Sequence, residues 1–458
     1  MAKSTGISTW EERRASGKAL RIRVPREIHG QWVPATDRPS VMDMLARSNK
    51  GRQPNLIPLR LSRMAASPYD FLRGSAGIMA ADLARTPVSG LRVLMSGDAH
   101  LGNFGLYGTP TRDVVFDLDD FDESTPGPWE WDLKRLTASI NVAGRTHGLG
   151  KRERHAVVAH AVATYRATAA RLQSLGILEG WYQSTSMEHP GPLLTTIFGP
   201  GESDATLVER AVSVARSRTS LALFAKVAEP HGSNHWRFRT DPPTLTAVSP
   251  AQTAEVRRSL ARYRSTLSPE RRELLGHYRI EDVAHRVVGV GSVGLRAYLV
   301  LLIGNGPGDP LLLQVKEATL PSAAPWLGAI WGRFRGHQGE RVVLAHRALQ
   351  ASSDLLLGWT TAERRHCFVR QMRNMKGSIP LEWLEGRQFL AYGAACAALL
   401  ARAHARTGDI AAIGGYCGGH STVLDDALGQ WAEAYGEQTE RDHAELVRAM
   451  KKVGGKGV

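Results

Sequence analysis

Residues 96–104 read SGDAHLGNF, and residues 114–122 read VVFDLDDFD. The first run follows Leu91 to Met95, a short apolar stretch that predicts a β-strand, and the second is itself rich in β-branched and aromatic residues. Phe104 to Tyr107 and Val114 to Leu118 can pair as a hairpin across the turn between them. That pairing would bring the acidic end of the second run beside Asn103.

Asp98 and Asn103 have the Asp-x-x-x-x-Asn spacing of a phosphoryl-transfer loop. In such a loop the Asp meets the acceptor hydroxyl and the Asn binds a divalent metal ion. His100 could orient Asp98, or it could simply be hydrogen-bonded within the loop. The spacing predicts catalytic roles for Asp98 and His100 and a metal-binding role for Asn103.

The acidic run supplies further candidate metal ligands. Period-two alternation places Asp120 on the opposite face of the strand from Asp117 and Asp119. We therefore expect Asp120 to bind the metal, with Asp122 assisting, and hard oxygen ligands of this kind suit Mg²⁺ or Mn²⁺.

The alternative is a polar turn whose Asp and Asn side chains only cap backbone groups. Four carboxylates between Phe116 and Asp122 would repel one another without a cation, which favours the metal site. Asp132 has a different expected role, because an Asp at a helix start accepts backbone N–H groups, here those of the loop at 96–103.

Residues 289–294 read GVGSVG, and residues 313–316 read LQVK. The same glycine spacing occurs near the start of dinucleotide-binding folds, but in those folds a helix follows the glycines. Leu295 to Ile303 is aliphatic and β-branched, so a strand is expected instead, as in a glycine-rich hairpin over nucleotide phosphates. The expected nucleotide-binding residues are Gly289, Gly291, Ser292, Gly294 and Lys316.

Glu340 is a candidate ion-pair partner for Lys316, although an acidic residue in a first helical turn can simply complement the helix dipole. Residues 368–376 are either a strand leading into a hinge, where backbone groups would meet adenine, or a plain basic edge. The sequence leaves both pairs of alternatives open.

Hydrophobic periodicity predicts a mixed α+β chain with no internal repeat. Residues 1–60 are expected to form an N-terminal arm, and 61–282 a mainly helical part with the loop and the acidic hairpin. Residues 283–376 are expected to form a β-rich part with a three-stranded meander. Residues 377–458 are expected to return to helices.

The chain of 458 residues has 58 Lys and Arg against 44 Asp and Glu, a formal charge of +14 that favours anionic partners. The basic residues are spread along the chain without a zinc or single-strand platform motif, so nucleic acid is not expected. Three cysteines without a Cys-x-x-Cys pair argue against a disulfide framework. No apolar run is long enough to cross a bilayer, so we expect a soluble, cytoplasmic protein with no membrane partner.

Residues 97–103 resemble the catalytic loop of aminoglycoside and choline phosphotransferases, and 120–132 resemble their metal-binding Asp and the helix after it. Ser96, in place of His or Tyr, and the missing glycine after Asp122 depart from that pattern. From about residue 18 to about residue 440 the chain is similar to an uncharacterised bacterial family, a domain of unknown function (DUF2252-like). The motifs that carry this likeness lie at 63–68, 97–105, 120–132, 289–294 and 314–318.

In kinase-like enzymes the glycine loop precedes the catalytic loop, whereas here it follows. The resemblance therefore implies a two-lobed, protein-kinase-like fold that is circularly permuted. It implies transfer of the γ-phosphoryl group of ATP, with Mg²⁺ or Mn²⁺, to a hydroxyl. The short spacing from Asp120 to Asp132 leaves no room for a long activation segment, which favours a small-molecule or phosphorylated acceptor.

Three other functions use the same residues. A nucleotidyl transferase would bind the nucleotide in the inverted orientation. A non-catalytic nucleotide-binding protein would keep the glycine hairpin without needing Asp98. A metallophosphoesterase is less expected, because it needs a second His-rich ligand set that the sequence does not provide.

Overall fold

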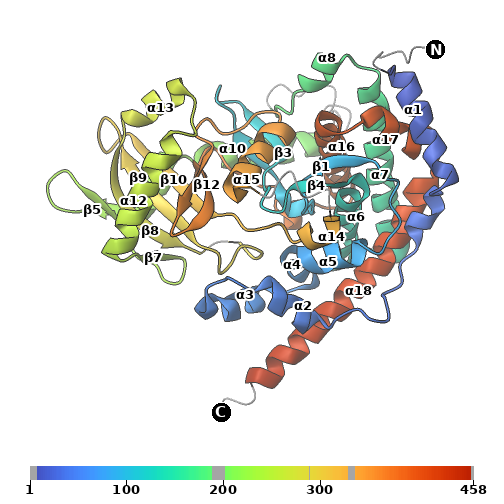
Figure 1. Cartoon of the computed structure of the whole chain (residues 1–458), viewed down its shortest axis with the longest axis horizontal. Coiled ribbons are helices and arrows are strands. Elements are labelled where there is room, and N and C mark those ends of the chain that lie inside the picture. Colours follow the sequence, from blue (N-terminus) through green and yellow to red (C-terminus); the bar gives the residue numbers. More distant parts are fainter. Residues whose placement is uncertain (1–7, 188–201, 288, 329–335, 455–458) are drawn as a thin grey trace.

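The structure is a computed structural model that describes residues 8–187, 202–287, 289–328 and 336–454. It is a mixed α+β chain, as expected, with a sheet at one side and a mainly helical part at the other (Figure 1). The kinase-like topology implied by the resemblance is a finer statement than this architecture alone establishes. None of the described helices is long and apolar enough to cross a membrane.

The largest sheet has six antiparallel strands in the order β11-β12-β10-β9-β8-β7. The strands are β7 (Leu245–Ala247), β8 (Arg279–Arg286), β9 (Ala297–Ile303), β10 (Pro310–Glu317), β11 (Gly358–Ala362) and β12 (Arg365–Gln371). The predicted meander is β8-β9-β10 and is confirmed. The sheet starts earlier along the chain than the boundary expected at residue 283, because β7 pairs with β8.

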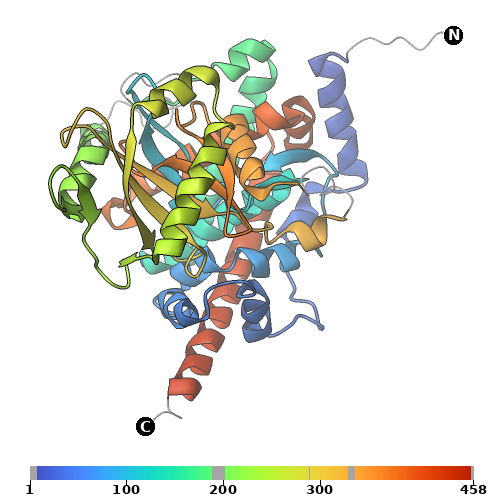
Figure 2. The same ribbon diagram turned by 60° about the vertical axis from the view of Figure 1, so that its left-hand side comes forward.

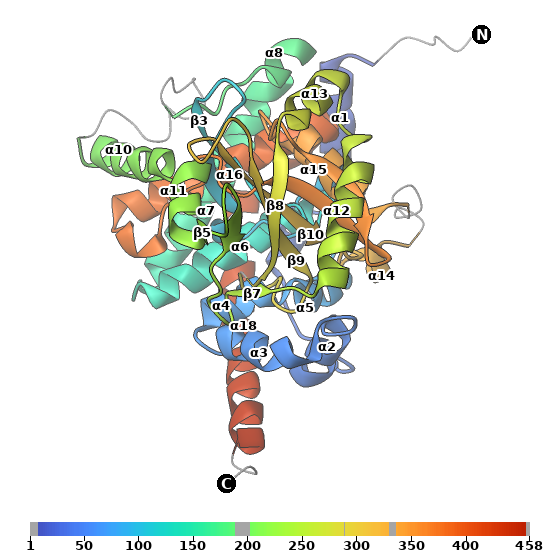
Figure 3. The same ribbon diagram turned by 90° about the vertical axis from the view of Figure 1, so that its left-hand side faces the viewer.

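Alternating side chains bury the two faces of this sheet against different helices. On one face, α12 (Pro250–Arg264) packs Val256 and Tyr263 against Val300 and Val315. On the other face lie α11 (Ser220–Val227) and α15 (Gln338–Leu349). Figures 2 and 3 show α12 lying across the front of the sheet, with α13 (Pro269–Gly276) at its end. Ser249 caps α12 and Pro250 follows in its first turn.

Four helices form the centre of the helical part, which shares one large apolar core. They are α6 (Trp129–Thr146), α7 (Lys151–Gln173), α16 (Arg387–Thr407) and α18 (Val423–Gly454). Around them lie α1 (Trp10–Ala19), α8 (Ile177–Trp181), α10 (Glu202–Ser217) and α17 (Ile410–Cys417). The short α14 (Ala324–Leu327) lies between β10 and α15.

The N-terminal region is helical rather than an irregular arm. It contains α2 (Val41–Ser48) and α3 (Ile57–Met64) in addition to α1. Two short helices follow, α4 (Pro68–Gly74) and α5 (Ala76–Leu83), separated by Ser75 at φ −116° and ψ 30°. In Figure 1 these blue helices line the lower side of the molecule beside α18.

Three strand pairs lie outside the large sheet. The predicted hairpin is confirmed as β2 (Phe104–Gly108) and β3 (Val114–Leu118). β1 (Arg92–Met95) pairs with β4 (Thr125–Pro128), and β5 (Ala228–Pro230) pairs with β6 (Trp236–Phe238). Strand β4 was not predicted, because its two prolines and its glycine are typical of a turn. Pairing with β1 keeps this segment extended.

A buried ion pair anchors the β2–β3 hairpin to α16. Arg402 donates from Nη2 to both carboxylate oxygens of Asp117 at 2.7 and 2.6 Å, and both side chains are fully buried. Asp117 also accepts the backbone N–H of Ala351, after α15. The hairpin is thus fixed to two helices that follow it by more than 200 residues in the sequence.

We predict that Arg402→Met lowers the free energy of unfolding by about 3–5 kcal/mol, because it leaves the Asp117 carboxylate buried without its counter-ion. Adding Asp117→Asn to Arg402→Met should recover a large part of the loss. Urea denaturation followed by circular dichroism measures both effects. The exposed Arg258→Met is the control, with a change of less than about 0.5 kcal/mol. A similarly small loss for Arg402→Met would contradict the assignment.

Candidate functional site

Side chains on one face of α6 hydrogen-bond to the loop at 96–103. Asp132 accepts the backbone N–H groups of Ser96 at 2.7 Å and Gly97 at 2.9 Å, as the sequence predicts. Ser139, seven residues further along α6, accepts the N–H of Leu101 at 3.0 Å. Because positions i, i+3 and i+7 share a helix face, residue 135 points at the same loop. The loop conformation is therefore set by a single buried helix.

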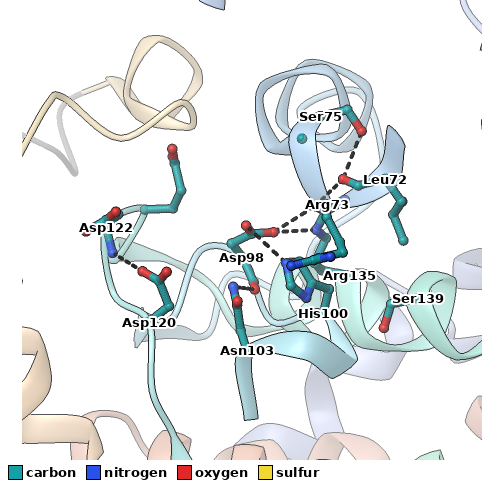
Figure 4. Close-up of polar contacts among 12 residues, drawn as sticks. Leu72, Arg73, Ser75, Asp98, His100, Asn103, Asp120, Asp122, Arg135 and Ser139 are labelled. Atoms are coloured by element: carbon teal, nitrogen blue, oxygen red, sulfur yellow. Dashed lines mark hydrogen bonds and ion pairs between the residues drawn. The ribbon is translucent and has the colours of Figure 1, made fainter. Parts of the chain in front are cut away.

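Arg135 is the third residue of that face and holds Asp98. Its Nε and Nη2 lie 2.8 and 2.7 Å from Oδ1 of Asp98, and its guanidinium is almost fully buried. Nη2 also donates to the carbonyl of Leu72 at 2.6 Å, which joins the loop to the end of α4 (Figure 4). Arg135 was not predicted as a site residue, although its spacing of three residues from Asp132 places both on one helix face and was a usable signal.

His100 lies beside Asp98, with its Nε2 3.7 Å from Oδ2 of the carboxylate. Burial lowers the pKa of this imidazole to about 4, although the nearby Asp98 carboxylate acts in the opposite direction. His100 is therefore neutral at physiological pH. Its position fits a role in orienting Asp98, one of the two alternatives that the sequence left open.

Asn103 closes the loop and touches the acidic hairpin. Its Nδ2 donates to the carbonyl of Asp98 at 2.8 Å, and its own carbonyl accepts the N–H of Asp119 at 3.0 Å. The backbone of the loop and the backbone after β3 are thus joined directly. The structure brings Asp98, Asn103 and the acidic run together, as the hairpin argument predicts.

The four carboxylates of the acidic run have different surroundings. Asp117 binds Arg402, and Asp119 forms an ion pair with Lys376 at 3.1 Å. Asp120 and Asp122 both line the cleft, and Oδ1 of Asp120 accepts the N–H of Asp122 at 3.2 Å. Asp120 is therefore separated from Asp117 and Asp119, as the alternation predicts.

Lys316, at the end of β10, forms an ion pair with Oδ2 of Asp122. Burial alone would raise the pKa of Asp120, but Lys316 and Arg370 hold that pKa well below its usual range. Burial and the neighbouring Asp120 raise the pKa of Asp122. Oδ1 of Asp122 is buried and accepts no hydrogen bond. Lys316 and Arg370 offset the charge of the two adjacent carboxylates, and the unpaired Oδ1 of Asp122 is the oxygen atom to which a further cation could bind.

The glycine loop, residues 289–294, joins β8 to β9 and leads into a strand, not a helix. Gly289 and Gly294 have φ of +75° and +90°, which glycine adopts readily. Residues of the N-terminal region fix the loop, because Arg63 donates to the carbonyl of Gly289 and Arg52 to that of Val293, both at 2.6 Å. The dinucleotide-fold alternative is excluded by the strand that follows.

One cleft of about 1400 Å³ is lined by both sets of motif residues. From the loop and hairpin come Asp98, His100, Asn103, Asp120 and Asp122, and from the glycine loop come Gly289, Val290, Gly291 and Ser292. Lys316 lies behind Asp122, where it lines a small adjoining space with Ser292 and Gly294. Residues almost 200 positions apart therefore face the same space.

Glu340 does not pair with Lys316. It lies in the first turn of α15, where its N–H is accepted by the ring of His337. Its neighbour Arg341 turns toward the acidic run instead and donates to the carbonyls of Ser124 at 2.5 Å and Asp122 at 2.7 Å. Burial lowers the pKa of Arg341 to about 10, still above neutrality. Nothing in the sequence distinguished Arg341 from other helix-surface arginines.

The basic segment at 368–376, which includes the end of β12, faces the acidic run, and this argues against a plain basic edge. Arg370 donates to the carbonyl of Asp119 at 3.4 Å, and Lys376 binds the Asp119 carboxylate. Among the residues that the structure describes, no three His, Cys, Asp or Glu side chains gather at metal-binding distance. Any protein-bound cation here would thus rely on two carboxylates, an amide oxygen and ligands from outside the chain.

Residues 52–449 match the family described as an uncharacterized protein conserved in bacteria (DUF2252). This match spans most of the chain, so the protein belongs to that family. No curated protein and no solved structure matches the chain.

We predict that Gly97→Ala destabilises the protein far more than Gly148→Ala. Both glycines have positive φ, +81° and +73°, which costs an L-residue about 1–2 kcal/mol. At Gly97 the added Cβ would lie 2.0 Å from the carbonyl oxygen of Glu123, whereas at Gly148 it would meet nothing within 4 Å. Thermal unfolding of both variants separates the steric effect from the backbone strain. Equal losses would show that the loop at 96–103 is not packed as described.

Proposed function

We propose that this family member is an ATP-dependent phosphotransferase that moves the γ-phosphoryl group to a hydroxyl of a small molecule. The observation that carries the proposal is the single cleft in which Asp98, Asn103, Asp120 and Asp122 face the glycine loop. Phosphoryl transfer requires this arrangement, because the phosphates must touch both groups at once.

Asp98 acts at the acceptor. The acceptor hydroxyl oxygen attacks the γ-phosphorus and forms the new O–P bond, while the bond from that phosphorus to the β–γ bridging oxygen breaks. ADP leaves with the electron pair, and Asp98 takes the hydroxyl proton. Arg135 and the neutral His100 position the carboxylate for this step.

Asn103, Asp120 and Asp122 would hold the divalent ion, Mg²⁺ or Mn²⁺, which supplies charge neutralisation at the phosphates. The partnerless buried Oδ1 of Asp122 and the hard-oxygen donor set fit such an ion. Lys316 binds phosphate in this proposal, and to do so it exchanges its contact with Asp122 for one with the nucleotide. In this proposal the N–H groups of Gly289, Gly291 and Ser292, which line the cleft, bind the phosphates, and Glu340 has no role.

The proposed fold is the circularly permuted kinase-like one. Two features support it, apart from the strand-glycine-strand order. The last turn of α16 meets β1, where the N–H of Leu94 donates to Oγ1 of Thr407 at 3.3 Å. A Cβ at Gly408 would lie 2.6 Å from Cγ1 of Val93. An unpermuted chain could therefore run from α16 directly into β1 and the loop at 96–103.

The test is incubation of the full chain with Mg²⁺ and ATP labelled at either the α- or the γ-phosphorus, against a pool of small hydroxyl compounds. Transfer of the γ-label supports the proposal. Transfer of the α-label identifies a nucleotidyl transferase on the same residues. ATP binding without transfer of either label would leave a non-catalytic nucleotide-binding protein and overturn the proposal.

Asp98→Asn should lower kcat by about 10²–10⁴-fold with little change in ATP affinity, because loss of a general base acts on the transition state. Single-turnover transfer of the γ-label and a separate ATP titration measure the two quantities. Asp426→Asn, on the exposed side of α18, is the matched control and should keep full activity. Normal turnover of Asp98→Asn would remove this residue from the mechanism.

Asp120→Ala and Lys316→Ala should both weaken ATP binding, for different reasons. Loss of a hard ligand removes the metal dependence, whereas loss of the cation leaves it intact. ATP titrations with and without Mg²⁺, followed by calorimetry, distinguish the two variants. If both bind ATP and Mg²⁺ like the natural protein, the site assignment fails.

A further inference from the structure

The cleft continues past the glycine loop along a basic wall, which we define as Arg52, Arg60 and Arg73. These residues lie beside or on α2, α3 and α4, in the N-terminal region. None of the motifs discussed above uses Arg60 or Arg73. The cleft of about 1400 Å³ exceeds the 300–1000 Å³ typical of a site for one small ligand, so there is space for a second one.

The charges of Arg52 and Arg60 are not neutralised within the described chain, where no carboxylate lies within ion-pair distance of either residue. Arg60 is 2% exposed and donates only to neutral oxygens: Oγ of Ser48, Oδ1 of Asn49 and the carbonyl of Gly74. Arg52 donates only to the carbonyls of Ser48 and Val293.

Two other arginines that line the cleft, Arg38 and Arg85, are paired with carboxylates, unlike Arg52 and Arg60. Arg38 binds Asp82 and Asp442, and Arg85 binds Asp37. Arg73 is intermediate, because its Nη1 binds the half-exposed Asp70 at 3.1 Å.

Unused donors in the wall point to an anion. The Nε atoms of Arg60 and Arg73 are buried and have no hydrogen-bond partner. Burial and the neighbouring Arg52 lower the pKa of Arg60 to about 9, so the guanidinium remains charged at neutral pH. A buried cation without a counter-ion is unfavourable, and an anionic ligand relieves it. Ala76 and Gly77, at the start of α5, line the same region, and Ser75 makes no side-chain cap there.

Arg73 of the wall lies on the side of Asp98 away from Asp120 and Asp122 (Figure 4). In Figure 4, Asp98 stands between Asp120 and Asp122 on one side and Leu72, Arg73 and Ser75 on the other. Arg135 binds both Asp98 and the carbonyl of Leu72, so the α4–α5 junction adjoins the carboxylate. A ligand at Arg73 can therefore approach Asp98 from the side away from Asp120 and Asp122 (Figure 4).

We propose that the acceptor is itself a phosphomonoester, whose phosphate binds the basic wall and the start of α5 while its hydroxyl lies at Asp98. This inference rests on the proposed phosphotransferase function. Two anionic ligands then share one cleft with separate sources of positive charge: the metal ion and Lys316 for the nucleotide, and the basic wall for the acceptor.

The first experiment offers matched pairs of probes with γ-labelled ATP: glycerol and glycerol 3-phosphate, ribose and ribose 5-phosphate, glucose and glucose 6-phosphate. Label should enter the phosphorylated member of a pair and be much lower in its uncharged partner. Label entering uncharged members equally or preferentially would overturn the phosphomonoester inference while leaving the phosphotransferase function standing.

The second experiment measures binding of inorganic phosphate to the full chain by calorimetry, without turnover. Arg73→Gln and Arg52→Gln should weaken binding by about 10- to 100-fold, the usual effect of losing a hydrogen bond from a charged group. Arg258→Gln, exposed on α12, is the control. Both variants change partly exposed side chains, so they test the wall without disturbing the fully buried Arg60.

Lys316→Ala distinguishes the two phosphate sites and should leave this binding unchanged. Phosphate binding that is lost in Lys316→Ala but kept in both arginine variants belongs to the nucleotide site and overturns the inference. Phosphate binding at the wall without any transfer from ATP would refute the phosphotransferase function and retain the anion site.

Discussion

The ion pair between Asp117 and Arg402 is the contact on which the arrangement of the cleft depends. Two fully buried opposite charges must stay together, because separating either from its partner leaves an uncompensated charge in the core. Asp117 lies one residue before the end of β3, and Asp119, Asp120 and Asp122 follow directly. Fixing Asp117 on α16 therefore fixes the position of the whole acidic run relative to the loop at 96–103.

Helix α6 provides the second constraint. It is buried along nearly its whole length, yet it carries Asp132, Arg135 and Ser139 on one face. Each binds a different part of the same loop, at Ser96 and Gly97, at Asp98 and at Leu101. A buried polar group must be hydrogen-bonded, so these side chains and the loop satisfy one another. The loop is held rigidly against α6, and this fixes the position of the Asp98 carboxylate, which must contact the acceptor hydroxyl in the proposed reaction.

The distribution of charge in the cleft links the two proposals. Carboxylates gather at the acidic run, where Lys316, Arg341, Arg370 and Lys376 offset their charge. The basic wall contains Arg52 and Arg60, which form no ion pair with a described carboxylate. A cleft with one acidic and one basic end is suited to a metal-bound polyanion at the first and a free anion at the second.

The sequence alone determined the local elements and the grouping of the motifs. Strand β1, the β2–β3 hairpin, the β8–β10 meander and the role of Asp132 all follow from periodicity, turn residues and helix capping, which act over a few neighbouring residues. The tertiary structure decided what depends on distant partners. It determined the choice of Asp122 over Glu340 as the partner of Lys316, the strand conformation of β4, and the positions of Arg135, Arg341 and the basic wall. These positions come from packing between distant elements, for example between residues 217 positions apart, and no local pattern encodes such contacts.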